Sequence, residues 1–106
     1  MIPQLSPAEA ALRLRDTPGA CLLDVRERWE WELTRVDGAQ HMPMNEVPQR
    51  WQTLPDEAPI LVLCHHGVRS NAVAQYLQKN GVDEVYNIRG GIDAWASEVD
   101  SALAKY

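Results

Sequence analysis

The residues best suited to chemistry lie together in one short segment that joins a predicted strand to a predicted helix. They are Cys64, His65, His66, Gly67, Val68, Arg69 and Ser70. In such a turn several backbone N–H groups can point inward and bind an anion, and the positive end of the following helix adds to the same field. These donors favour the thiolate, which is the nucleophilic form of cysteine. The segment therefore predicts a reactive cysteine at position 64.

Glycine and arginine in the same turn argue against a cysteine that is merely buried. Gly67 allows backbone conformations that are closed to other residues, and Arg69 offers a planar fork of N–H donors to an oxyanion. A purely packing role would explain Cys64 alone, because free cysteine often behaves as a small apolar residue, but it would not explain the residues that follow. We therefore interpret Cys64 as catalytic and residues 65–70 as the active loop that binds substrate.

The elements on either side of this segment predict a parallel α/β fold. Continuous apolar runs indicate buried strands at residues 20–25 and 59–64. Weaker strands are expected at residues 2–5, 38–42 and 83–87, and helices from 7 to the Pro18-Gly19 pair, at 28–33, 45–54 and 70–80, and from 90 onward. Strands that alternate with helices predict a central parallel sheet of about five strands with helices on both faces, in one domain spanning residues 1–106.

The two cysteines are expected at opposite edges of this sheet. Cys64 ends its predicted strand, and ligands of open parallel sheets bind at the carboxyl ends of the strands. Cys21 opens its strand, so a rise of ~3.3 Å per residue places the two sulfurs on the order of 15 Å apart. A disulfide requires Cα atoms within about 7 Å. We therefore expect two free thiols, with Cys21 buried and inert.

Four segments in matching order resemble the signatures of the rhodanese-like sulfurtransferase family. The segment Cys64–Arg69 is similar to the six-residue active loop of that family, and Leu22–Glu27 resembles its upstream signature. Gly38-Ala39 followed by Pro43 resembles the end of the upstream signature, and Asn87–Trp95 is similar to a segment near the carboxyl end of the family's domain. The resemblance covers nearly the whole chain and points to the small single-domain members.

The resemblance implies a two-step transfer of sulfur through Cys64. A donor such as thiosulfate would leave its sulfane sulfur on Cys64 as a persulfide, and a thiophilic acceptor would then remove it: cyanide in the test tube, a thiol or a protein in the cell. Arg69 would hold the sulfonate end of the donor, while Asp24 and Arg26 would support the loop. No cofactor is implied. Thr34-Arg35-Val36 departs from the family's usual Gly-His-Ile, which concerns the local turn rather than the chemistry.

Two other functions stay open, and a metal site is not expected. A phosphatase or arsenate reductase of the Cys-x5-Arg type would need a longer loop, because Arg69 comes only five positions after Cys64. A sulfur carrier or binding module without turnover would use the same cysteine and pass sulfur to one protein partner. His65 and His66 beside Cys64 suggest metal ligands, but neighbouring residues of a tight loop seldom aim at one point, so we expect no metal.

Composition excludes some partners. Fifteen acidic residues against ten basic ones give a formal charge of -5, and no cluster of Lys and Arg is present to follow a phosphate backbone. No apolar run approaches the roughly 20 residues of a membrane helix, and the first residues lack the features of a signal peptide. We therefore expect a cytoplasmic protein with no nucleic-acid or membrane partner.

Overall fold

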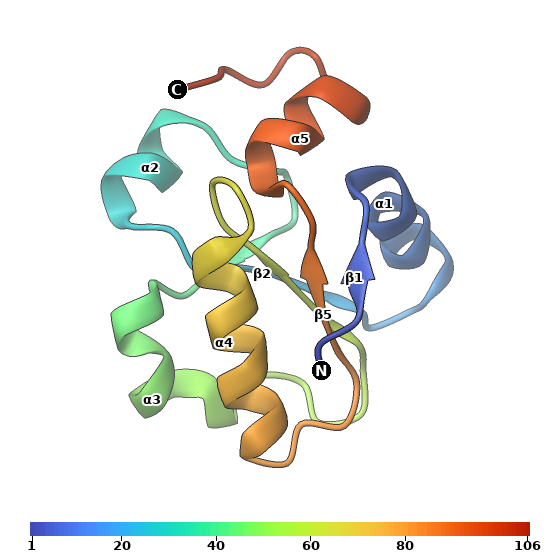
Figure 1. Ribbon diagram of the computed structural model, residues 1–106, viewed down its shortest axis with the longest axis vertical. Coiled ribbons are helices and arrows are strands. Elements are labelled where there is room, and N and C mark those ends of the chain that lie inside the picture. The colour runs from blue at the N-terminus through green and yellow to red at the C-terminus, as the bar shows by residue number, and fades with distance from the viewer.

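A five-stranded parallel sheet forms the centre of the computed structural model, which describes residues 1–106 (Figure 1). The strands lie in the order β1-β5-β4-β2-β3 and every pair is parallel. They are β1 (Gln4–Leu5), β2 (Cys21–Asp24), β3 (Gln40–His41), β4 (Ile60–Leu63) and β5 (Val85–Ile88). The helices are α1 (Pro7–Asp16), α2 (Arg28–Leu33), α3 (Val47–Arg50), α4 (Val68–Lys79) and α5 (Gly91–Glu98). The predicted fold class is confirmed.

Side chains of the central strand β4 alternate between two apolar cores. Ile60 and Val62 point to the core that includes residues of α4, whereas Leu61 and Leu63 point to the core that includes residues of α1 and α5. Both faces are therefore covered, and all four residues of β4 are buried. This explains why the strand is a continuous apolar run rather than an alternating one.

Local sequence signals fix the start of α1 as expected. The hydroxyl of Ser6 accepts a hydrogen bond from the backbone of Glu9 at 3.1 Å, and the carboxylate of Glu9 accepts one from the backbone of Ser6 at 2.8 Å. Pro7 occupies the first helical position, where its missing N–H costs nothing. The helix is therefore closed at its amino end by its own side chains.

The helix predicted for residues 45–54 is broken into three pieces. A 3-10 turn at Met44–Glu46 precedes α3, and a second 3-10 turn at Trp51–Thr53 follows it. Pro48 has no N–H to donate to Met44, and Val47 donates to that carbonyl instead. Asn45 lies inside the first turn and does not cap a helix, so this prediction was wrong in both respects.

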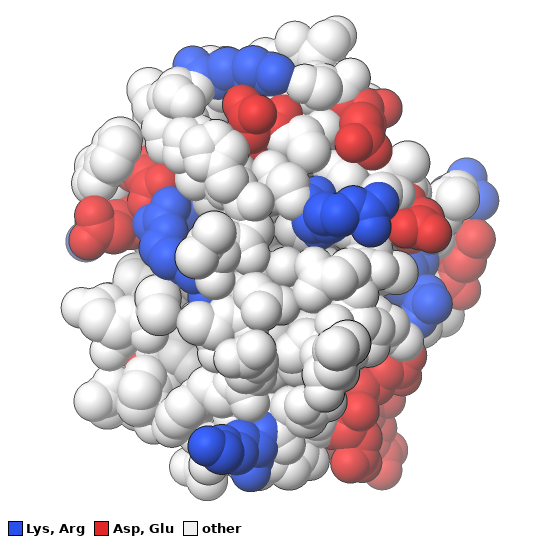
Figure 2. Space-filling model, viewed as in Figure 1, with Lys and Arg blue, Asp and Glu red and all other residues white.

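Charged side chains are distributed as separate patches on the face that carries α4. Figure 2 shows Lys and Arg in isolated groups, with acidic groups beside several of them and a broad uncharged area between. This face therefore offers no continuous basic track. None of the helices combines the length and the apolar composition that crossing a bilayer would require.

Candidate active site

Cys64 lies directly after β4, the middle strand of the sheet, at the carboxyl edge. The last residue of β4, Leu63, pairs with Asp24 at the end of β2, and Val62 pairs with Asn87 of β5. Cys21 pairs with Ile60 at the other end of β4. The predicted separation of the two cysteines is thus confirmed, and both are free thiols. Burial raises the pKa of Cys21.

The sulfur of Cys64 is enclosed by the loop that follows it. The backbone N–H of Gly67 points at Sγ from 3.0 Å, and the hydroxyl oxygen of Ser70 lies 3.2 Å from it. Gly67 has a φ of +104°, which a residue with a side chain rarely adopts, and α4 begins at the next residue. Cys64 is therefore only 1% exposed and sits at the amino end of a twelve-residue helix.

The start of α5 holds the other side of the loop. The backbone N–H of Ile92 donates to the carbonyl of Cys64 at 2.8 Å, and that of Asp93 donates to the carbonyl of His65 at 3.2 Å. Gly91 makes this approach possible, because a Cβ at that position would collide with the carbonyl oxygens of Cys64 and His65. The segment beginning at Asn87 therefore contributes to the site by fixing the loop backbone.

Asn87 connects Ser70 to the loop and was given no role by the sequence. The hydroxyl of Ser70 donates to Oδ1 of Asn87, while Nδ2 of Asn87 donates to the carbonyl of Gly67 at 3.2 Å. Because its proton goes to Asn87, the oxygen of Ser70 is free to accept from the Cys64 thiol. Its place in the segment Asn87–Trp95 was the only signal for this residue.

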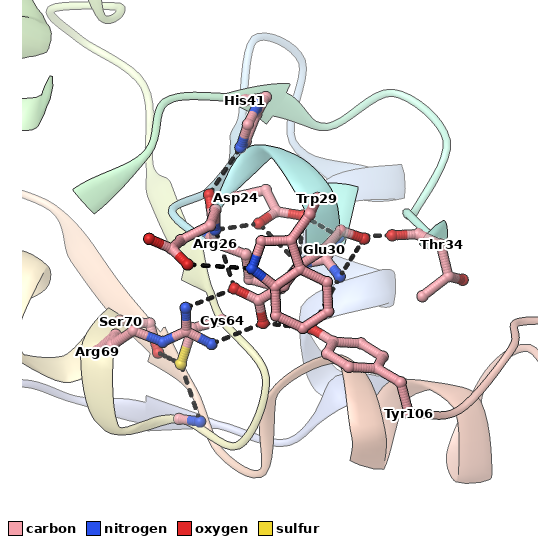
Figure 3. A network of polar contacts seen from close by, with 12 residues as sticks. Asp24, Arg26, Trp29, Glu30, Thr34, His41, Cys64, Arg69, Ser70 and Tyr106 are labelled. Atoms are coloured by element: carbon pink, nitrogen blue, oxygen red, sulfur yellow. Dashed lines mark hydrogen bonds and ion pairs between the residues drawn. The ribbon is translucent and has the colours of Figure 1, made fainter. Parts of the chain in front are cut away.

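Asp24 and Arg26 form a buried ion pair at the end of β2. Their side chains are fully buried, with Nη2 of Arg26 2.7 Å from Oδ2 of Asp24. The guanidinium also donates to the carbonyl of Thr34 at 2.6 Å and to that of Glu30 at 3.2 Å. The pair therefore fixes both ends of the chain segment that contains α2 (Figure 3). One of these ends is Thr34, where the sequence begins to depart from the family's usual one.

Glu30 of α2 joins this buried pair to the active loop. Its carboxylate receives two N–H groups of Arg69, at 2.6 and 2.9 Å, and its side chain is only 3% exposed. Burial raises the pKa of Glu30, but hydrogen bonds from Arg69, Tyr106 and the backbone of Glu27 outweigh it and lower the pKa to about 2. The same contact raises the pKa of Arg69. Sequence reasoning missed Glu30, because a glutamate in a short helix matches no motif.

This pairing changes the expectation for Arg69. Both Nη atoms donate to the carboxylate of Glu30, which fixes the orientation of the guanidinium (Figure 3). Nε and the outer N–H groups have no hydrogen-bond partner in the protein, so they remain as free donors of the fork. The Arg69 side chain as a whole is 34% exposed, although its partner Glu30 is buried.

His65 and His66 form a stacked column with Tyr106. The ring of His65 lies between those of His66, at 3.8 Å between centroids, and Tyr106, at 3.9 Å. Burial and the nearby His66 lower the pKa of His65. The ligand atoms of both histidines and of Asp93 lie within 4.8 Å of one another.

The chain belongs to the rhodanese-like domain family, whose sequence model matches residues 6–98. A thiosulfate sulfurtransferase GlpE from Tolumonas auensis is 38% identical over 87 residues, which cover 82% of each chain. A protein of the same name from Pseudomonas putida is 32% identical over 99 residues, 93% of this chain and 90% of the relative. A rhodanese-like domain protein from Staphylococcus aureus superposes with a TM-score of 0.84 at 26% identity, over 99% of both chains.

Proposed function

We propose that this protein transfers sulfane sulfur through a persulfide on Cys64. The observation that supports the proposal best is the enclosure of the Cys64 sulfur at the carboxyl edge of the sheet, with the Gly67 N–H at 3.0 Å. Such a donor stabilises a sulfur anion, which is the charge state of both the thiolate and the terminal sulfur of a persulfide. The relatives named thiosulfate sulfurtransferase support the same chemistry for this chain.

The proposed reaction has two balanced steps. The Cys64 thiolate attacks the outer sulfur of thiosulfate, an S–S bond forms, and the original S–S bond breaks with its electron pair leaving on sulfite. An acceptor nucleophile then attacks the outer sulfur of the persulfide and regenerates the thiolate. With cyanide as the acceptor the product is thiocyanate. In the cell we propose a thiol or a protein as the acceptor, and no cofactor takes part in either step.

Arg69 is proposed to bind the oxygen atoms of the donor. Its fork is held by Glu30, so the edge that includes Nε is presented without a further loss of side-chain freedom. Asp24 and Arg26 are proposed to stabilise the position of Glu30, because Arg26 donates a hydrogen bond to the backbone carbonyl of Glu30. The site therefore has two parts. The first is the set of groups that surrounds the Cys64 sulfur (the sulfur nest), and the second is the guanidinium of Arg69, which is proposed to bind oxyanions.

The intact mass after incubation with thiosulfate tests the proposal directly. We expect the protein to gain one sulfur atom, and cyanide to release it as thiocyanate. Cys64→Ser should gain nothing, whereas Cys21→Ser should load like the wild type, because Cys21 lies at the other edge of the sheet. Equal loss in both cysteine variants would contradict the assignment of the site. No gain in reduced and folded wild-type protein would refute the function, and phosphatase assays would then follow.

The burial of Cys64 favours a second candidate, a sulfur carrier that serves one protein partner. At 1% exposure the sulfur is reached only when the loop opens, and a docked protein provides the contacts for such an opening. A carrier would load from a donor but release sulfur slowly to every small acceptor. Comparing cyanide with dithiothreitol as acceptor separates the candidates, because rapid turnover with either one supports the enzyme.

We propose the cytoplasm as the location, supported by the two free thiols.

A further inference from the structure

The chain beyond α5 returns to the active site. In Figure 1 it runs from the end of α5 across to α2. Tyr106 stacks its ring on His65, with 3.9 Å between centroids and 7° between planes, and meets the edge of Trp29 at 5.8 Å. Lys105 next to it donates to the hydroxyl of Ser97 at 2.6 Å. The family match ends at residue 98, so this contact comes from a segment outside it.

The hydroxyl of Tyr106 links the two charged pairs of the site. It accepts a hydrogen bond from Nη1 of Arg26 at 3.0 Å and donates one to Oε2 of Glu30 at 2.7 Å (Figure 3). Oε2 is also the oxygen that receives Nη2 of Arg69 at 2.9 Å. Burial raises the pKa of Tyr106 to about 12, so its proton stays available to Glu30 at neutral pH.

Loss of this hydroxyl would loosen one side of the Glu30 carboxylate. Oε2 would then keep only Arg69, and the buried Nη1 of Arg26 would keep only the Glu30 carbonyl at 3.2 Å. The carboxylate would then be held only by Arg69 and, at Oε1, by the backbone N–H of Glu27. With one contact fewer to fix its terminal torsion, the carboxylate and the Arg69 fork that it binds would be held less rigidly. The sulfur nest around Cys64 does not contact the hydroxyl, so it would be left in place.

We propose that Tyr106 is a positioning residue that sets the orientation of Arg69 through Glu30. The inference rests on the proposed sulfur transfer and deepens it, because it concerns only donors with oxygen atoms for Arg69 to bind. Thiosulfate carries such oxygens, whereas inorganic polysulfide offers a transferable sulfur without any. Cys64 would attack either donor, releasing sulfite from the first and a polysulfide shortened by one sulfur from the second.

The test compares the rates at which Tyr106→Phe and wild type load sulfur from these two donors. The substitution removes the hydroxyl and keeps the ring on His65. At low thiosulfate we expect loading to be about tenfold slower, the usual effect of losing one hydrogen bond to a charged group. With polysulfide the rates should be equal. Most of the loss should lie in the KM for thiosulfate, with little change in kcat.

Tyr86→Phe is the matched control for this test. The hydroxyl of Tyr86 likewise receives an arginine, Arg13 at 2.9 Å, and donates to a glutamate, Glu84 at 2.8 Å, but it belongs to neither pair of the site. This variant should load like the wild type from both donors. Equal rates for Tyr106→Phe and wild type with thiosulfate, or an equal loss with both donors, would overturn the positioning role. A wild type that loads from neither donor would instead refute the proposed function.

Discussion

The substitution Glu30→Gln removes the charge that joins α2 to the active loop while keeping the size of the side chain. In the native protein the Glu30 carboxylate receives Arg69, Tyr106 and the backbone of Glu27. These contacts lower its pKa from an ordinary value of 4.5 to about 2 although burial opposes the shift. A carboxylate whose folded pKa is depressed stabilises the fold above its unfolded pKa and loses that contribution as pH falls toward the folded one.

The magnitude follows from the two pKa values. Each tenfold change in an ionisation constant corresponds to about 1.4 kcal/mol, so Glu30 contributes on the order of 3 kcal/mol to folding at pH 7. The contribution is nearly complete at pH 4.5 and is lost between there and about pH 2. At pH 3.5 about 1.4 kcal/mol of it has already gone. The stability of the wild type should therefore approach that of Glu30→Gln as the solution is acidified.

Urea unfolding followed by tryptophan fluorescence at pH 7, 4.5 and 3.5 measures this difference. The free energy of unfolding of wild type minus that of Glu30→Gln should shrink by about 1.4 kcal/mol between the first and last pH. Glu46→Gln is the matched control, because Glu46 pairs with Arg50 at 2.6 Å in an exposed position and should contribute less than about 1 kcal/mol. A Glu30 difference that stays constant with pH would refute the reasoning.

Two further predictions concern the frame of the site. Asp24→Asn leaves the buried Arg26 without its counterion and should destabilise the fold by about 3–5 kcal/mol. Asp16→Asn, in the exposed pair with Arg15, should have little effect, and thermal unfolding of the two variants compares them. Gly91→Ala should displace the loop and slow persulfide formation on Cys64, because its Cβ would collide with the loop carbonyls. Gly38 also has a positive φ, +85°, but open space lies around it, so Gly38→Ala should leave that rate unchanged. Equal rates of persulfide formation in the two glycine variants would contradict the role of Gly91.

The placement of the candidate nucleophile could be predicted from the sequence. A continuous apolar run identified β4, and the end of a parallel strand is where ligands bind, so Cys64 was expected at the edge where it lies. Capping at Ser6 was equally readable, because the two residues that bond are three positions apart. The break in the helix at α3 could not be predicted in the same way. Pro48 indicates a disturbance, but local propensity does not say how far one proline shortens a helix.

The partners of the loop were decided only by the tertiary structure. Glu30 meets Arg69 across 39 positions of the chain, and Tyr106 meets Arg26 across 80. Neither periodicity nor spacing in the sequence predicts such pairs, because they depend on how α2 and the segment after α5 pack beside the end of the sheet. The sequence by itself determined the fold class, the strand that ends just before Cys64 and the loop that contains it, since these follow from local patterns of burial and backbone freedom. The orientation of Arg69 required the folded chain, because it is set by a buried carboxylate and a tyrosine brought together from distant segments.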